Sequence, residues 1–250
     1  MALGGCATRR VALPADPGTP FPDFAKVHAQ ASSACAGVRT LTVEIGLAGR
    51  AGRQRLRGRV VAGFERPASM RLEAVAPFGQ PVFVLAARGD TATLLLRRDT
   101  RVLTGARADE ILGALTGMTL APADVQAILT GCVLPEPRAT GGRMHRNGWA
   151  SIDLSGDAIV YFQREEESWQ PRAARRAGWQ IEYSSWQGDF PRTVRLRSDD
   201  PGVDVDLTAT LSQIEANVDL DQAAFAVAVP PGASAITLDE LRAAGPLRGR

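Results

Sequence analysis

The chain of 250 residues is long for one domain, although β-rich sandwiches and barrels reach this size as a single unit. Hydrophobic residues make up 45% of it, and no apolar run approaches the roughly 20 residues of a membrane-spanning helix. Its 29 basic residues, all arginine except Lys26, are spread along the chain against 27 acidic residues. We therefore expect no transmembrane helix and no nucleic-acid binding, which needs a concentrated basic surface.

The first 20 residues combine a short motif with a proline-rich segment. Leu3-Gly4-Gly5-Cys6 is similar to the lipobox of bacterial lipoproteins, in which a cysteine after small residues receives lipid. Only five residues precede Cys6, so the usual regions of a secretory signal are missing; either the start codon was assigned too late or the match is chance. We expect covalent lipid on Cys6, with residues 1–20 as a lipobox remnant and flexible tether.

A helix and a β-hairpin follow. Residues 23–36 lack Gly and Pro, are rich in Ala and begin with an acidic residue, which predicts a helix. Apolar residues then alternate over 41–47 and 58–64 around a turn at 49–52, which predicts a hairpin with one apolar face. Alternation resumes over 72–74, 82–87 and 92–96, and this spacing without helices predicts an antiparallel meander.

The turn Ala76-Pro77-Phe78-Gly79 interrupts this meander. Pro77 fixes its φ and Gly79 can take positive φ, so the chain reverses sharply and lifts Phe78 onto a loop tip. An apolar ring at a loop tip suggests contact with a membrane or with an apolar ligand. The alternative is that Phe78 packs onto a neighbouring strand at the rim of the sheet.

Two short helices then interrupt the sheet. Residues 108–115 and 122–129 switch to helical periodicity; Thr116-Gly117 closes the first helix and Pro122 opens the second. After a loop over 134–142, strands resume in five segments: 149–154, 158–163, 179–183, 193–197 and 203–211. The fold class is therefore mainly β with α, a large curved antiparallel sheet of about ten strands whose concave side is filled by side chains, helices or ligand.

We expect residues 21–220 to form the main domain and residues 221–250 to form a C-terminal tail. The tail contains an apolar stretch and then Thr237-Leu-Asp-Glu240, which fits a capping box at the start of a short helix. It would dock on the sheet as a final strand and helix, or cover the open edge of the sheet.

No combination of residues points to catalysis. We find no nucleophile beside a base and no paired carboxylates, and His28 and His145 lie in contexts typical of surface or structural residues. The cysteines and histidines share no metal-type spacing, so we expect no enzyme activity, no metal and no cofactor. In an exported protein Cys35 and Cys132 would form a disulfide; the equal alternative is two buried thiols.

Arg172, Arg175 and Arg176 make the densest basic patch, between Trp169 and Trp179. Such a loop could touch anionic lipid head groups. The alternative, which we favour because arginine is abundant throughout the chain, is an ordinary hairpin tip in solvent.

The segment from Arg71 to Gly131 resembles the LolB family of outer-membrane lipoproteins, which shares its fold with the periplasmic carrier LolA. The resemblance is carried by Ala76-Pro77-Phe78-Gly79, Ala108-Asp-Glu-Ile-Leu112, Leu115-Thr-Gly-Met-Thr-Leu120 and Ala127-Ile-Leu-Thr-Gly131, and more weakly by Gly178-Trp-Gln-Ile-Glu-Tyr183. The chain departs from the family pattern in its C-terminal tail, in Phe rather than Leu at the loop tip and in the missing signal peptide.

The resemblance implies an incomplete antiparallel β-barrel of about ten to eleven strands, with helices covering its open mouth. It implies that an apolar cavity accepts the acyl chains of lipoproteins from a LolA-like donor, and that Pro77, Phe78 and Gly79 form the membrane-insertion loop. The expected protein is a monomer, anchored by lipid to the periplasmic face of the outer membrane.

The residues expected to line the cavity are apolar and lie on alternating strands or on one face of the two helices. They form a core first and a ligand surface second. They are Val43, Ile45, Val60, Phe64, Leu72, Leu94, Leu96, Ile111, Leu115, Met118, Ile128, Val160, Phe162 and Ile181.

Two other functions fit the same residues. One is a carrier lipoprotein of this fold that binds some other amphiphile. The other is an assembly lipoprotein whose sheet binds a protein partner and never holds lipid.

Overall fold

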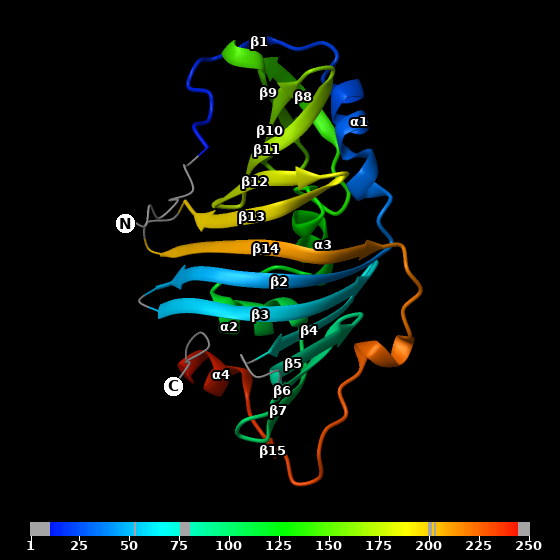
Figure 1. The fold of residues 1–250 in the computed structure, drawn as a ribbon. Coiled ribbons are helices and arrows are strands. Elements are labelled where there is room, and N and C mark those ends of the chain that lie inside the picture. Colours follow the sequence, from blue (N-terminus) through cyan, green and yellow to red (C-terminus); the bar gives the residue numbers. More distant parts are fainter. Residues whose placement is uncertain (1–10, 53, 76–80, 200–201, 203, 245–250) are drawn as a thin grey trace, which may run out of the picture.

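A computed structural model of the protein describes residues 11–52, 54–75, 81–199, 202 and 204–244. One open, curved sheet dominates this part of the chain, and helices lie against its inner face (Figure 1). The described residues form fifteen strands, in the spatial order β1-β8-β9-β10-β11-β12-β13-β14-β2-β3-β4-β5-β6-β7-β15. The two outermost strands, β1 and β15, do not pair with each other, so the sheet is an incomplete barrel.

All neighbouring strands are antiparallel except β15, which runs parallel to β7. In chain order the strands are β1 (Thr19–Pro20), β2 (Thr40–Ala51), β3 (Gln54–Glu65), β4 (Ser69–Val75), β5 (Pro81–Arg88), β6 (Thr91–Leu96), β7 (Arg101–Ala106), β8 (Ala139–Met144), β9 (Trp149–Leu154), β10 (Ala158–Glu165), β11 (Ser168–Arg176), β12 (Trp179–Gln187), β13 (Phe190–Ser198), β14 (Val205–Ala216) and β15 (Ser234–Ala235).

The helices are short and occupy distinct places. They are α1 (Phe24–Ala36), α2 (Ala108–Thr116), α3 (Pro122–Leu129) and α4 (Leu238–Ala244), with 3-10 turns η1 (Arg146–Gly148) and η2 (Gln222–Phe225). Helix α1 packs on β8 and β11, α2 packs on β6 and α4, and α3 packs on β13, β3 and β4. In Figure 1, α2 and α3 lie behind the front strands β14, β2 and β3.

Strand alternation places the apolar residues on the inner face. Val43 pairs with Ala62 and Ile45 with Val60 across β2 and β3, so one face of this hairpin is uniformly apolar. These side chains join one core that also contains the inner faces of α2 and α3. Each fully buried aliphatic or aromatic side chain contributes about 1.5–3 kcal/mol relative to exposure, which is why the helices close over this face rather than the outer one.

The sequence predicted the architecture and most of its elements. The mainly β fold class with an incomplete antiparallel barrel is confirmed, as are the helices at α1, α2 and α3. Gly117 ends α2 with φ at 78° and Pro122 lies in the first turn of α3, as their positions predicted. In the tail, the predicted capping box is present: Thr237 Oγ1 accepts from the Glu240 N–H at 3.2 Å.

The sequence analysis expected loops where β8 and β11 lie, and it assigned no element to the residues of β7. Strand β8 lies in the expected loop over 134–142 and contains two glycines, residues that disfavour strands. Gly142 is required there, because a Cβ on it would lie 2.4 Å from the Cβ of Phe24. Strand β11 contains Pro171 and four arginine or glutamine residues, which hide its alternation, so the expected basic loop is a strand instead.

No helix among the described residues combines the length and apolar character needed to cross a membrane.

Candidate functional site

The candidate site is a cavity of about 270 Å³ beneath the lid, a name used here for α2, α3 and the connection between them. The lid covers the cavity, and β11, β12 and β13 form its floor. Its lining residues are Gly117, Thr119, Leu120, Ile128, Arg176, Ala177, Trp179, Ile181 and Leu196. Gly117, Thr119 and Ala177 are exposed and form the mouth.

The cavity presents both apolar and polar surface. Ile128, Ile181 and Leu196 are buried and supply its inner wall. Its volume lies just below the roughly 300–1,000 Å³ of pockets that enclose whole small ligands. With the lid in this position the cavity has room for only a small group, and a larger ligand would require the lid to move.

Arg176 fastens the lid to the sheet beside the cavity. Its guanidinium donates to Asp124 Oδ1 at 2.7 Å and to the Val133 carbonyl at 3.1 Å. Asp124 also accepts from the Ala121 N–H at 3.1 Å, so one carboxylate caps α3 and pairs with the sheet. Both charged side chains are largely buried, which makes this pair stronger than a surface ion pair.

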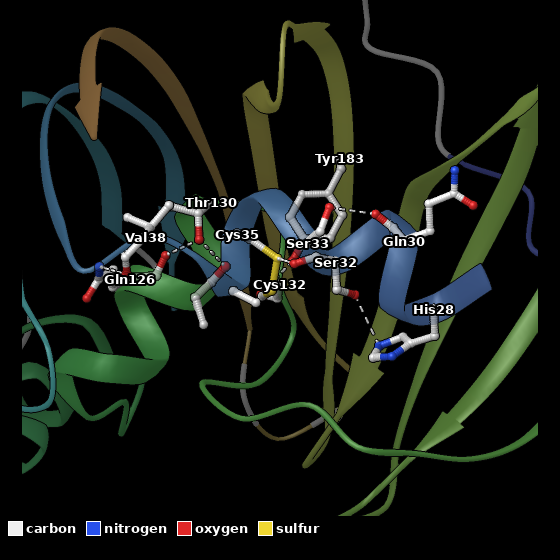
Figure 2. Close-up of a disulfide and its surroundings, with 12 residues drawn as sticks. His28, Gln30, Ser32, Ser33, Cys35, Val38, Gln126, Thr130, Cys132 and Tyr183 are labelled. Atoms are coloured by element: carbon white, nitrogen blue, oxygen red, sulfur yellow. Dashed lines mark hydrogen bonds between the residues drawn. A yellow bond between two sulfur atoms is a disulfide. The ribbon is translucent and has the colours of Figure 1, made fainter. Parts of the chain in front are cut away.

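The far end of α3 is held by a disulfide. Cys35 near the end of α1 is bonded to Cys132, which follows α3, and their Cα atoms are 5.8 Å apart (Figure 2). Of the two alternatives that the sequence left open, the structure has the disulfide. Disulfides persist in oxidising compartments, so this bond is consistent with an exported protein.

Buried hydrogen bonds reinforce this end of the lid. Gln126, only 1% exposed, donates from Nε2 to the Val38 carbonyl at 3.2 Å (Figure 2). Tyr183 on β12 donates to the Cys132 carbonyl at 3.4 Å. Burial raises the pKa of Tyr183 far above its ordinary value, so its hydroxyl stays a neutral donor. Helix α3 is therefore fixed at both ends.

The residues predicted to line a cavity all face the inner side of the sheet or the helices. Ile128 and Ile181 line the cavity. The others pack in the main core around it: Val43, Ile45, Phe64, Leu72, Leu94, Ile111, Leu115, Val160 and Phe162 are buried, and Val60, Leu96 and Met118 are partly buried. Whether they contact a ligand when the lid opens stays a prediction.

Cys6 and the loop residues Pro77, Phe78 and Gly79 lie outside the described residues. The strands on either side of the loop, β4 and β5, are described and pair with each other.

Sequence reasoning missed the polar and bulky residues of the site, namely Arg176, Trp179 and Leu120. Arg176 was assigned to a hairpin tip, whereas it lines the cavity and pairs with Asp124. Arg176 lies two residues after Ala174, which pairs with Ile181 across β11 and β12. The period of two along a strand therefore puts Arg176 on the same face as Ala174, and this periodicity is the signal that could have identified it. Arg175, one residue away, is the exposed arginine that the prediction described.

A second group of polar residues lies on the outer side of β8 and β9. His145 Nδ1 is 3.2 Å from Asp16 Oδ1, and His145 Nε2 is 2.9 Å from Ser151 Oγ. These are the residue types of a serine hydrolase, but Ser151 is buried within β9 and the His145 side chain is 6% exposed. The Ser151 hydroxyl is therefore enclosed, and the contacts among Asp16, His145 and Ser151 attach the N-terminal segment beside β1 to the edge of the sheet.

No group of three or more His, Cys, Asp and Glu side chains in the described part of the chain is arranged to hold a metal ion. The cavity itself offers one guanidinium, already paired, and no carboxylate among its lining residues.

Comparison with solved structures supports the fold. A DUF1329 family protein from Desulfovibrio piger aligns with a TM-score of 0.53 at 10% identity, covering 83% of this chain and 97% of the other. A LolA superfamily protein from Nitrosomonas europaea aligns with a TM-score of 0.53 at 10% identity, covering 82% and 98%. At this identity the likeness shows the shared fold alone. No curated protein matches by sequence.

The family comparison is more specific. The model of the family described as "Outer membrane lipoprotein LolB" matches residues 42–213, which is more than two thirds of the chain. The matched part runs from β2 to β14 and includes the lid and every residue that lines the cavity. The chain therefore belongs to the outer membrane lipoprotein LolB family and has a lipoprotein-related carrier role.

Proposed function

We propose that the protein accepts lipoproteins by taking their acyl chains into the cavity beneath the lid and then inserts them into the outer membrane. The observation that carries this proposal is the cavity itself, whose apolar inner wall of Ile128, Ile181 and Leu196 opens at an exposed mouth. Transfer of apolar surface from water releases about 25 cal/mol per Å², so a hydrocarbon chain binds there without covalent chemistry.

Release to a membrane needs no separate energy source under this proposal. A bilayer offers the chains an apolar environment similar to the cavity, so the free energy of binding is returned when they move from one to the other. The donor would be a LolA-like periplasmic carrier, which presents the chains in the same kind of environment. The acceptor would work as a monomer.

The membrane-insertion loop would be Pro77-Phe78-Gly79. Phe78 at the tip of that loop would insert among the head groups and lower the barrier for chains that leave the cavity. Covalent lipid on Cys6 would anchor the protein to the periplasmic face of the outer membrane. The Cys35–Cys132 disulfide supports this location, because the periplasm is oxidising.

The cargo site is tested by blocking the mouth. Thr119 is exposed and lines the cavity, so Thr119→Trp should fill the entrance and abolish binding of a synthetic diacyl lipopeptide to the purified protein. Thr104→Trp on the exposed side of β7 is the matched control and should bind as the wild type does. Equal binding by both variants would contradict the proposed site.

The delivery step is tested separately in cells depleted of the native acceptor. Phe78→Glu should keep the fold and the lipopeptide binding but fail to deliver lipoproteins to the outer membrane. Full delivery by Phe78→Glu would contradict the role of the loop. Native mass spectrometry of the purified protein distinguishes the other functions: a bound amphiphile without lipoprotein delivery indicates a different cargo, and no bound amphiphile indicates an assembly role.

A further inference from the structure

The C-terminal segment after β14 lies outside the family match and wraps around the sheet. It first crosses the outer face of β4 and β5 at η2, where the Arg71 guanidinium donates to the Ala224 carbonyl at 2.9 Å and the Ala226 carbonyl at 3.0 Å. Phe225 is 4% exposed at this crossing. The segment then turns around the β7 edge and returns on the side of the lid (Figure 1).

Its second half attaches to the edge strand. The Ser234 N–H donates to the Thr100 carbonyl at 3.0 Å, and the Ile236 N–H donates to the Val102 carbonyl at 2.8 Å. These bonds continue the sheet by one short parallel strand. They bring the chain over the β7 edge, so that α4 starts beside the lid.

Helix α4 then packs against α2. The Thr237 N–H donates to Glu240 Oε2 at 2.7 Å, and the same carboxylate lies 3.6 Å from Arg101 on β7. Ile236 and Leu241 are buried and belong to the same core as Ile111 of α2. The free energy of this docking therefore comes mainly from two apolar side chains, with the cap and the ion pair fixing the orientation of α4.

The two helices of the lid are held by different means. Helix α3 is fixed by the disulfide at Cys132, by Asp124 paired with Arg176 and by the buried Gln126. Helix α2 has no covalent link of this kind among the described residues and packs against α4 instead. Glycines with positive φ precede and follow it, Gly105 at 80° and Gly117 at 78°, and such residues accommodate backbone rotation at low cost.

We propose that the C-terminal segment is a clasp that holds α2 and the connection after it, whose residues Gly117, Thr119 and Leu120 line the cavity, and that cargo enters when α4 leaves the core and α2 moves with this connection while α3 stays fixed. The small volume of the closed cavity requires such a movement for a complete acyl chain. This inference rests on the proposed function for the identity of the cargo. It adds which half of the lid moves and which segment controls it.

The test uses the full chain with Ile236→Ser and Leu241→Ser together. Loss of both apolar anchors should release α4 but leave the disulfide and α3 in place. The matched control is Phe225→Ser, which removes a buried apolar residue from the part of the segment on the outer face. Amide hydrogen exchange of residues 108–116 and 122–129 is measured for each protein, together with the association rate of cis-parinaric acid, a fatty acid that fluoresces in apolar surroundings.

The double variant should exchange several-fold faster in α2 than the wild type, with α3 unchanged, and should bind the fatty acid several-fold faster. The control should match the wild type in both measurements. Equal acceleration of exchange in α2 and α3 would overturn the clasp, because it would indicate general destabilisation. An unchanged association rate would overturn it as well.

The result separates this inference from the proposed function. Wild-type protein that binds no fatty acid overturns the proposed cargo site, and the clasp as a cargo gate with it. Wild-type protein that binds the fatty acid at the same rate as the double variant overturns the clasp alone.

Discussion

The two lid helices differ in how they are attached to the same sheet. Helix α3 is joined to α1 by a disulfide and to β11 by an ion pair, whereas α2 depends on apolar packing and on α4. A covalent link limits movement in every state of the protein, while apolar contacts can be exchanged for contacts with an acyl chain. One lid helix is thus tied covalently to α1, and the other is held only by contacts that can be exchanged.

The largest effect is expected from removing the disulfide. The bond joins residues 97 positions apart, so Cys35→Ala with Cys132→Ala should lower the free energy of unfolding by about 2–5 kcal/mol. Urea unfolding measures this loss, and reduction of the wild type should reproduce it. In hydrogen exchange α3 should then become as mobile as α2; an unchanged stability would show that α3 does not depend on the bond.

A smaller loss is expected at the other end of α3. Arg176→Gln leaves the partly buried Asp124 without its ionic partner and should cost about 1–3 kcal/mol in urea unfolding. Arg175→Gln is the matched control, because Arg175 is exposed and 4.0 Å from Asp199; it should change stability by no more than about 0.5 kcal/mol. Similar losses for both would contradict the fastening role of Arg176.

Helix α1, to which the disulfide joins α3, contains a histidine that should make the free energy of unfolding depend on pH. His28 on α1 is buried edge-on to Phe162, with ring centroids 6.2 Å apart, and burial lowers its pKa below 6.5. Between the lowered folded pKa and 6.5, the unfolded chain binds a proton that the folded protein does not, so stability falls as pH falls through this window. The contribution to the slope is at most about 1.4 kcal/mol per pH unit.

His28→Gln should remove that slope, because glutamine does not titrate. Urea unfolding at a series of pH values gives the difference between the two proteins. A wild type that loses no stability relative to His28→Gln on acidification would show that His28 can be protonated in place.

The smallest effect is expected on the α2 side. Thr237→Ala removes the hydroxyl that caps α4 and should weaken that helix by about 1 kcal/mol. Because α4 can open without unfolding the sheet, the loss should appear as faster exchange in α4 and α2 rather than as a shift in the urea midpoint. Thr104→Ala, on the exposed side of β7, is the control. Faster exchange confined to α4 would indicate that α2 does not rely on it.

The sequence predicted those strands and helix boundaries that are determined by residues close together in the chain. Alternation gave β2 to β6, and Gly117, Pro122 and the capping box at Thr237 gave the helix boundaries. The strands that were missed depend on distant partners: β8 accepts Gly142 because Phe24 lies against it. Propensity alone cannot report such a contact, since it is decided by a helix more than 100 residues away.

The same distinction applies to the site. An apolar cavity wall could be predicted because Ile128 and Ile181 follow the periodicity of their elements. The pairing of Arg176 with Asp124 and the contact of His145 with Asp16 join residues separated by long stretches of chain. Cys35 and Cys132 were identified as candidates, but their proximity is a property of the folded α1 and α3.

The most direct test of the central claim is photoaffinity labelling with a diacyl lipopeptide that carries a diazirine within one acyl chain. After irradiation and digestion, mass spectrometry identifies the labelled residues. If acyl chains bind beneath the lid, the label should appear on Ile128, Ile181 or Leu196 and should be lost in Thr119→Trp. Labelling confined to the outer face of the sheet, or unaffected by Thr119→Trp, would contradict the account.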